Sequence, residues 1–179
     1  AEFLIRKNTG KLTGWIGYTL SKTTRYFDEI DNGESFPAKY DRRHDLSVTS
    51  TYKLTKSWDI SAVFIYATGN AITLPSQRYV IDGNIYTEYT SRNGFRIDPY
   101  HRLDIGATYK PSKKKKFYSS WNFSIYNVYN RKNPYFIYLD LEENLDNQNG
   151  SIQDGNLTPK AYQVSIFPIL PSITWNFNF

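Results

Sequence analysis

Between residues 69 and 99 the sequence carries a mixed aromatic and basic set suited to contact a ligand. Arginine guanidinium groups pair with anionic ligands, and aromatic faces stack on sugars or on the rings of chelators. Loops often carry such groups on a rigid scaffold. The alternative is that the aromatic side chains pack the loops on one another. The set comprises Arg78, Tyr79, Tyr86, Tyr89, Arg92, Phe95 and Arg96.

From this set the sequence predicts a ligand-binding surface at Arg78, Tyr86, Tyr89, Arg92 and Arg96. If replacing both Arg92 and Arg96 with Ala left the ligand affinity unchanged, these two arginines would not belong to the ligand-binding surface.

The other titratable residues do not form a catalytic or metal-binding pattern. His44 and His101 occupy equivalent positions at the tops of separate predicted strands, facing outward, where we expect interfacial roles. Asp45 and Asp104 are expected on the opposite face, in ion pairs. The absence of Cys removes disulfides, Cys-containing zinc sites and thiol nucleophiles. The sequence therefore predicts no enzyme activity and no cofactor.

Two charged segments have a structural explanation. The acidic group Asp140, Glu142, Glu143 and Asp146 lacks the spacing of a calcium loop, so we expect a solvated loop and no metal site. The four lysines at 113–116 are consistent with a nucleic-acid contact or a solvated turn. We favour the turn and predict no nucleic-acid partner.

Composition favours β-structure. The chain of 179 residues contains 16 Tyr and 11 Phe, residue types enriched in strands. Its mean hydropathy of −0.59 and the lack of an apolar run near 18 residues exclude a transmembrane helix. They do not exclude a membrane barrel, whose strands carry apolar residues only at alternate positions.

Apolar and polar residues alternate with period two along seven segments, which predicts seven antiparallel strands. We expect a bulge near Phe167 and Pro168, where the apolar parity changes. Segments 78–81 and 85–90 are expected to form a protruding hairpin. The seven predicted strands are 2–7, 11–24, 45–53, 58–66, 101–110, 117–129 and 162–179.

Short and long connections alternate between these strands. This alternation of connection lengths is typical of outer-membrane barrels, which have short periplasmic turns and long extracellular loops. If the short turns are periplasmic, the last strand must run toward the periplasmic side. Segments 44–53 and 101–110 both run from His to Tyr and Lys, and eight steps of ~3.3 Å tilted by ~40° rise about 20 Å, close to the apolar band of such barrels. The short connections are 8–10, 55–57 and 111–116, and the long ones are 25–40, 69–99 and 130–160.

The C-terminal stretch 171–179 ends on large apolar residues. Ile173, Trp175, Phe177 and Phe179 alternate with polar residues, as in a strand between lipid and a wet lumen. An edge strand of a soluble β-sandwich is the alternative. The sequence opens on Ala1 without a signal-peptide pattern. Because a membrane barrel must be exported, we expect the chain to be a piece of a longer one.

Three motifs resemble the C-terminal barrel region of TonB-dependent outer-membrane receptors. They are Tyr40-Asp41-Arg42-Arg43-His44-Asp45-Leu46, Asn127-Val128-Tyr129-Asn130-Arg131-Lys132-Asn133-Pro134-Tyr135 and the terminal Ile173-Thr174-Trp175-Asn176-Phe177-Asn178-Phe179. The resemblance covers nearly the whole chain, residues 1–179, as the last third of a 22-stranded antiparallel transmembrane β-barrel. The ending also looks like the family's assembly signal.

The resemblance implies an active importer in the bacterial outer membrane, energised through TonB and gated by a ligand. The ligand would be a large, scarce nutrient: an iron chelate, a vitamin, an oligosaccharide or a peptide. The partners implied are outer-membrane lipid and lipopolysaccharide, the barrel-assembly machinery, and the TonB complex through a plug region absent from this sequence. Whether a surface lipoprotein forms a lid stays open.

Two other classes of protein remain as alternatives: a passive porin or structural or adhesive barrel, and a soluble carbohydrate-binding β-sandwich. A plug domain upstream would favour import over the porin. A requirement for detergent would exclude the sandwich. Seven is an odd number for a self-contained bacterial barrel, which favours a fragment.

Overall fold

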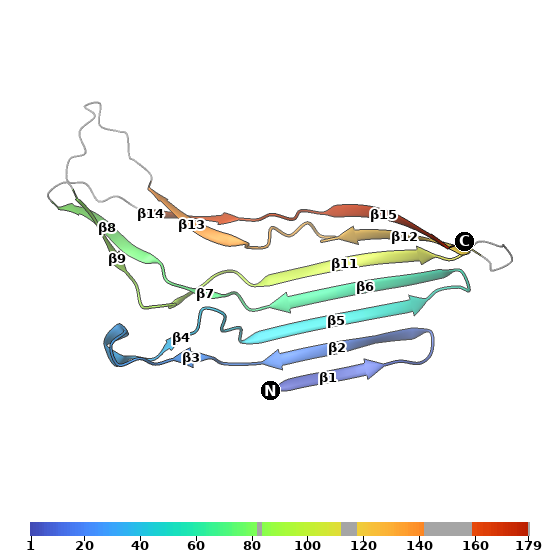
Figure 1. The fold of residues 1–179 in the computed structure, drawn as a ribbon, viewed down its shortest axis with the longest axis horizontal. Coiled ribbons are helices and arrows are strands. Elements are labelled where there is room, and N and C mark those ends of the chain that lie inside the picture. The colour runs from blue at the N-terminus through green and yellow to red at the C-terminus, as the bar shows by residue number, and fades with distance from the viewer. Residues whose placement is uncertain (82–83, 112–117, 142–158, 179) are drawn as a thin grey trace, which may run out of the picture.

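The molecule is built around one antiparallel sheet of seven strands. The computed structural model describes residues 1–81, 84–111, 118–141 and 159–178. In the sheet the strands lie in the order of the chain, as a meander (Figure 1). They are β1 (Glu2–Lys7), β2 (Leu12–Leu20), β5 (His44–Lys53), β6 (Trp58–Ala67), β11 (Tyr100–Tyr109), β12 (Tyr118–Tyr126) and β15 (Leu170–Asn178).

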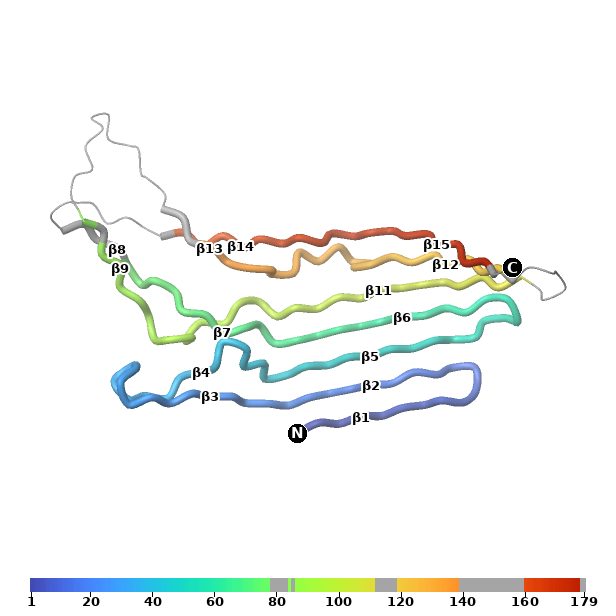
Figure 2. Tube along the Cα trace, in the orientation of Figure 1, coloured from blue at the N-terminus to red at the C-terminus, as the bar shows by residue number. Residues whose placement is uncertain are grey.

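The predicted alternation of short and long connections is confirmed. The short connections gather at one end of the sheet and the long ones at the other, which we call the turn end and the loop end (Figure 2). The last strand, β15, runs toward the turn end (Figure 1). Strands β1 and β15 form the two edges of the sheet and do not pair with each other.

The long connections carry short two-stranded ladders of their own. The first also includes a short 3-10 helix, η1 (Asp31–Gly33). The protruding hairpin predicted in the second is confirmed as β8 with β9. These ladders are β3 (Thr24–Arg25) with β4 (Phe36–Pro37), β7 (Ala71–Ile72) with β10 (Phe95–Arg96), β8 (Pro75–Ile81) with β9 (Asn84–Tyr89), and β13 (Phe136–Leu141) with β14 (Pro159–Val164).

One face of the sheet is apolar across all seven strands. Residues paired across an antiparallel ladder share a face, so the register assigns each side chain. The row Ile16, Val48, Phe64 and Leu103 shows this in the middle of the sheet. The large members of this apolar face are Phe3, Ile5, Leu12, Ile16, Tyr18, Leu46, Val48, Tyr52, Trp58, Ile60, Phe64, Tyr66, Leu103, Ile105, Tyr109, Trp121, Phe123, Ile125, Ile173, Trp175 and Phe177.

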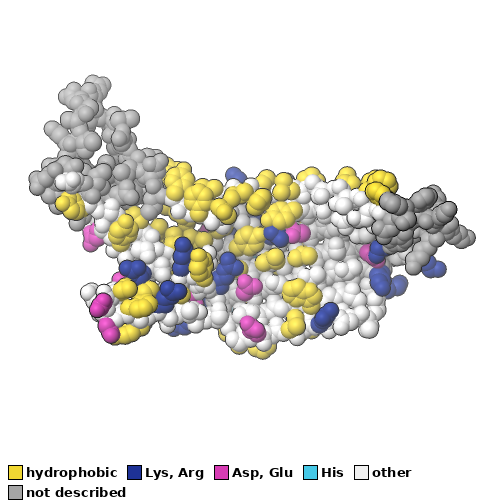
Figure 3. Space-filling view, in the orientation of Figure 1, with side chains coloured by type: hydrophobic (Ala, Val, Ile, Leu, Met, Phe, Trp, Pro, Cys, Tyr) yellow, Lys and Arg dark blue, Asp and Glu magenta, His cyan; other side chains and the backbone are white. Residues whose placement is uncertain are grey.

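The opposite face, the polar face, carries hydroxyl, amide and charged side chains. Six apolar side chains interrupt it: Leu4, Trp15, Val63, Ile65, Ala67 and Leu170. In Figure 3 neutral polar side chains and backbone predominate over the lower strands, and hydrophobic side chains gather along the upper edge. The polar members include Thr13, Thr19, Asp45, Ser47, Thr49, Thr51, Asp59, Ser61, Arg102, Asp104, Thr108, Asn122, Ser124, Ser172, Thr174 and Asn176.

The prediction of one continuous final strand with a bulge is wrong. The segment divides into β14 and β15, which pair with different partners, and residues 165–169 between them belong to neither ladder. Asn127 explains the break: it is fully buried, with φ of 54°, and its Nδ2 donates to the backbone oxygens of Arg131 and Phe167. The Asn130 Oδ1 also accepts a hydrogen bond from the Ile169 N–H. Side-chain amides therefore replace the ladder at this point.

Candidate functional site

The buried side chains of the described chain lie at the base of the loop end. Phe36, Ala38, Ala67 and Ala71 form its apolar part. Phe36 and Ala38 come from the connection between β2 and β5, Ala71 comes from the one between β6 and β11, and Ala67 is the last residue of β6. This small core therefore joins two loops that are distant in sequence. Asn93 reinforces the junction, because its Nδ2 donates to the Pro37 oxygen over 2.8 Å.

Asp41 and Arg96 make an ion pair inside this junction. The Asp41 side chain is only 2% exposed, against 32% for Arg96. Arg96 also donates to the Gly69 oxygen over 3.1 Å, and the other Asp41 oxygen accepts from the Thr23 N–H. Gly69 is required here because a Cβ would lie 1.8 Å from the Ile97 oxygen. We call this group, Thr23, Asp41, Gly69 and Arg96, the loop clamp.

The electrostatics of the loop clamp favour an ionised Asp41. Burial opposes its ionisation, but the Thr23 hydrogen bond and the nearby Arg96 guanidinium outweigh this, so the pKa of Asp41 lies below its usual value. The carboxylate therefore stays charged at neutral pH and holds Arg96 in place. This arrangement gives Arg96 a structural role, and its ligand-binding role stays a prediction.

Arg92 differs from Arg96 in its surroundings. It is exposed, and its guanidinium lies 5.6 Å from the centre of the Phe36 ring. Its backbone N–H faces the Asp31 carboxylate at 3.4 Å. A guanidinium that stacks on an aromatic face keeps its edge available for hydrogen bonds to an anion. Of the two arginines, Arg92 is the more exposed, and its role in ligand binding stays a prediction.

The predicted tyrosines do not share one surface. Tyr86 and Tyr89 lie three positions apart on β9 and are both exposed, at 48% and 62%. Since alternate residues of a strand point to opposite faces, these two side chains lie on opposite sides of the hairpin. Arg78 lies in β8, opposite Thr87, but its side chain falls outside the described structure.

The two histidines have matching environments on the apolar face. The His44 Nδ1 and the Tyr18 hydroxyl lie 2.8 Å apart, and so do the His101 Nδ1 and the Tyr129 hydroxyl. His101 also stacks on Tyr66. Each imidazole is therefore held by an aromatic partner at the loop end of the sheet.

The two aspartates predicted to form ion pairs do so. Asp104 pairs with Arg102 over 2.9 Å and also accepts from the Asn127 N–H. Asp45 faces Arg42 at 3.7 Å, where both side chains are more than one-third exposed. Arg102 further stacks on Tyr126 at 4.0 Å, which makes the Asp104 group the more enclosed of the two.

The sequence predictions missed the roles of Asp41 and Asn127. Both stand in the motifs that carry the family resemblance. Asp41 precedes a regular strand pattern, and Asn127 follows one. For Asn127, the signal is an Asn at the end of an alternating run, a residue type that accepts positive φ and caps backbone groups. For Asp41, no local signal identifies Arg96, which lies 55 residues further along the chain.

Several predictions concern residues outside the described structure: the lysine run at 113–116, Glu142, Glu143 and Asp146 of the acidic loop, and Phe179 of the C-terminal signal. The backbone of Asp140 lies in β13. Within the described ranges, no group of three or more His, Cys, Asp or Glu side chains could hold a metal ion. In the same ranges, no helix is long and apolar enough to cross a membrane.

Comparison with protein-family models, with curated proteins and with solved structures finds no match to this chain.

Proposed function

We propose that this sheet is part of the wall of a β-barrel in a bacterial outer membrane. The observation that supports this is the apolar face, which crosses all seven strands and has no second layer over it among the described residues. At its two edges Ile5 is 69% and Ile173 67% exposed, and on the central strand β6 Ile60 is still 38% exposed. A continuous apolar surface of this extent is unfavourable in water and favourable against lipid.

The two ends of the sheet support an orientation for this wall. Long connections occupy one end and short ones the other (Figure 1), which is the asymmetry of outer-membrane barrels. In the proposed orientation the loop clamp and Arg92 face the cell exterior, and β15 ends at the periplasmic rim. The polar face then lines the lumen, and the open edges at β1 and β15 pair with further strands of the same barrel.

The function we propose for the barrel is active import of a large nutrient, energised through TonB. This step rests on the resemblance of the three sequence motifs to TonB-dependent receptors. Stacked Arg92 and the exposed tyrosines of β9 supply groups for a ligand at the mouth. The assembly role of Ile173, Trp175 and Phe177 belongs to the same proposal, because all three lie on the apolar face of the terminal strand.

Cysteine labelling tests the orientation directly, since the chain contains no Cys. Tyr26→Cys places a thiol in the first long connection and Lys56→Cys places one in a short turn, both at exposed positions. In intact cells carrying the full-length protein, a membrane-impermeant maleimide should label the first variant only. Both should react after the outer membrane is permeabilised. Equal labelling of the two variants in intact cells would contradict the proposed wall.

Import is tested separately from the wall. Uptake of a labelled nutrient should require both this protein and TonB, and the purified full-length protein should give little conductance in a planar bilayer. A passive porin would conduct without TonB. A soluble β-sandwich would purify without detergent and leave both thiols unprotected by a membrane.

A further inference from the structure

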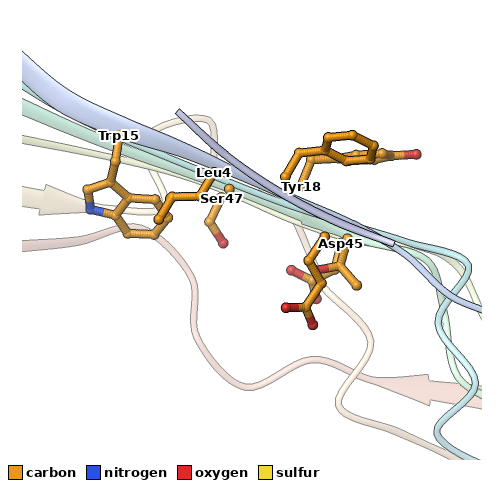
Figure 4. Close-up of a pocket in the computed structure, with 9 residues that line it drawn as sticks. Leu4, Trp15, Tyr18, Asp45 and Ser47 are labelled. Carbon is orange, nitrogen blue, oxygen red and sulfur yellow. The ribbon is translucent and has the colours of Figure 1, made fainter. Parts of the chain in front are cut away.

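A hollow opens on the polar face where β1, β2 and β5 run side by side (Figure 4). Trp15, Leu4, Ser47 and Asp45 extend to one side of the sheet there, whereas Tyr18 extends to the other. The register brings the members together, because Gly17 of β2 lies between Leu4 and Ser47. Leu4 and Trp15 are two of the apolar side chains that interrupt the polar face, and neither the loop clamp nor the apolar face uses them.

Trp15 forms an aromatic shelf in this hollow. A Cβ on Gly17 would lie 3.2 Å from the Trp15 ring, so the absence of a side chain at Gly17 lets the indole lie close against the strand. Trp15 is nevertheless 38% exposed. One side of the ring thus covers backbone, and an open side remains for a flat, partly apolar partner.

The polar groups around the shelf include both signs of charge. Thr19 pairs with Glu2 on one side and Asp45 on the other, so two carboxylates and a hydroxyl share one row of the polar face. Arg6 pairs with Trp15 in the register, and Arg42 faces Asp45 at 3.7 Å. The two arginines balance the two carboxylates, which disfavours a ligand chosen for its charge.

We propose that this hollow is a subsite for a neutral oligosaccharide. The apolar face of a pyranose ring would lie on Trp15, while carboxylates accept hydrogen bonds from its hydroxyl groups and Ser47 or Thr19 donates to or accepts from them. Such a site combines an apolar surface with a few polar groups that fix orientation. It extends the proposed function, since in the proposed barrel the polar face lines the route of an imported ligand.

Binding in vitro tests the subsite without requiring transport. The full-length protein in detergent would be titrated with maltotriose, cellotriose and triacetylchitotriose, followed by saturation-transfer NMR. At least one trisaccharide should bind. Trp15→Ala should weaken it roughly tenfold or more, as loss of a stacked aromatic contact implies, whereas Trp15→Phe should stay within about threefold. Trp121→Phe, on the apolar face, is the matched control and should bind normally.

Three results would overturn the subsite: no trisaccharide binds, Trp15→Ala binds as tightly as the parent, or arginine methyl ester binds at Trp15 and the sugars do not compete. The last would identify a cation site. Unchanged protease resistance of each variant shows that it is folded. The cysteine-labelling pattern is independent of sugar binding, so failure of the subsite can be told apart from failure of the proposed wall.

Discussion

In the seven-stranded sheet, strand pairing is made by backbone ladders, and large apolar side chains stay exposed along the whole apolar face. At the loop end, by contrast, buried side chains and an enclosed ion pair hold irregular backbone together. The stability of the sheet therefore depends on the medium that contacts its apolar face, whereas the loop end is stabilised by its own small core. A change of solvent should affect the first region, and removal of a single side chain should affect the second.

The largest expected effect is on the sheet. Val48 and Thr49 are neighbours on β5, on the apolar and the polar face respectively. In a lipid bilayer Val48→Arg should cost about 2–4 kcal/mol, because a charge on the lipid side of a strand is poorly solvated, while Thr49→Arg should cost far less. Urea titration of the protein folded into lipid vesicles measures both. Equal costs would mean that the apolar face does not meet lipid.

The next effect belongs to the loop clamp. Asp41→Ala removes the partner of Arg96 and leaves its partly buried donors without a carboxylate, which should cost about 1–3 kcal/mol of local stability. Hydrogen exchange should rise in segments 22–41 and 69–97 and stay unchanged in the sheet. The double variant with Arg96→Ala should lose less than the sum of the single changes, since the two residues act as a pair. Additive losses would show that the residues stabilise the loops separately.

Acid should destabilise the same loops less than Asp41→Ala does, because a protonated Asp41 keeps its hydrogen-bonding atoms. Its pKa is lowered in the folded protein, so the carboxylate stabilises the loops fully above its unfolded pKa of about 3.9. That stabilisation is lost as the pH falls through the lower folded pKa. Exchange in 22–41 measured between pH 6 and pH 3 should therefore rise only in the acid range, and Asp41→Asn should remove this dependence. A rise above pH 5 would point to another group.

The smallest effect on stability is expected for Arg92. Arg92→Ala should change the free energy of unfolding by no more than about 0.5 kcal/mol, because the side chain is exposed. Arg92→Ala should nevertheless lower the ligand affinity at the loop end. Arg96→Ala, by contrast, should mainly lower the stability of the loops. If Arg92→Ala binds ligand normally, the stacked guanidinium only covers Phe36.

These differences show what the amino-acid sequence determines here. Alternation along 45–53 or 58–66 predicts strands because side chains of a strand point to opposite faces at every step. Turn and loop lengths predict the meander and the segregation of connections to two ends. Local information was enough for both, since neighbouring strands in the chain are also neighbours in the sheet.

Only the tertiary structure decided the contacts between distant segments. Arg96 meets Asp41 across 55 residues, and Asn127 reaches Phe167 across 40, ending a ladder that the alternation alone would have continued. The hollow at Trp15 likewise depends on the tertiary structure, because the pairing of β1 and β5 with β2 brings carboxylates to either side of Thr19. A pattern of alternating side chains fixes the face on which each residue lies, but not which distant residue will satisfy a buried charge or amide.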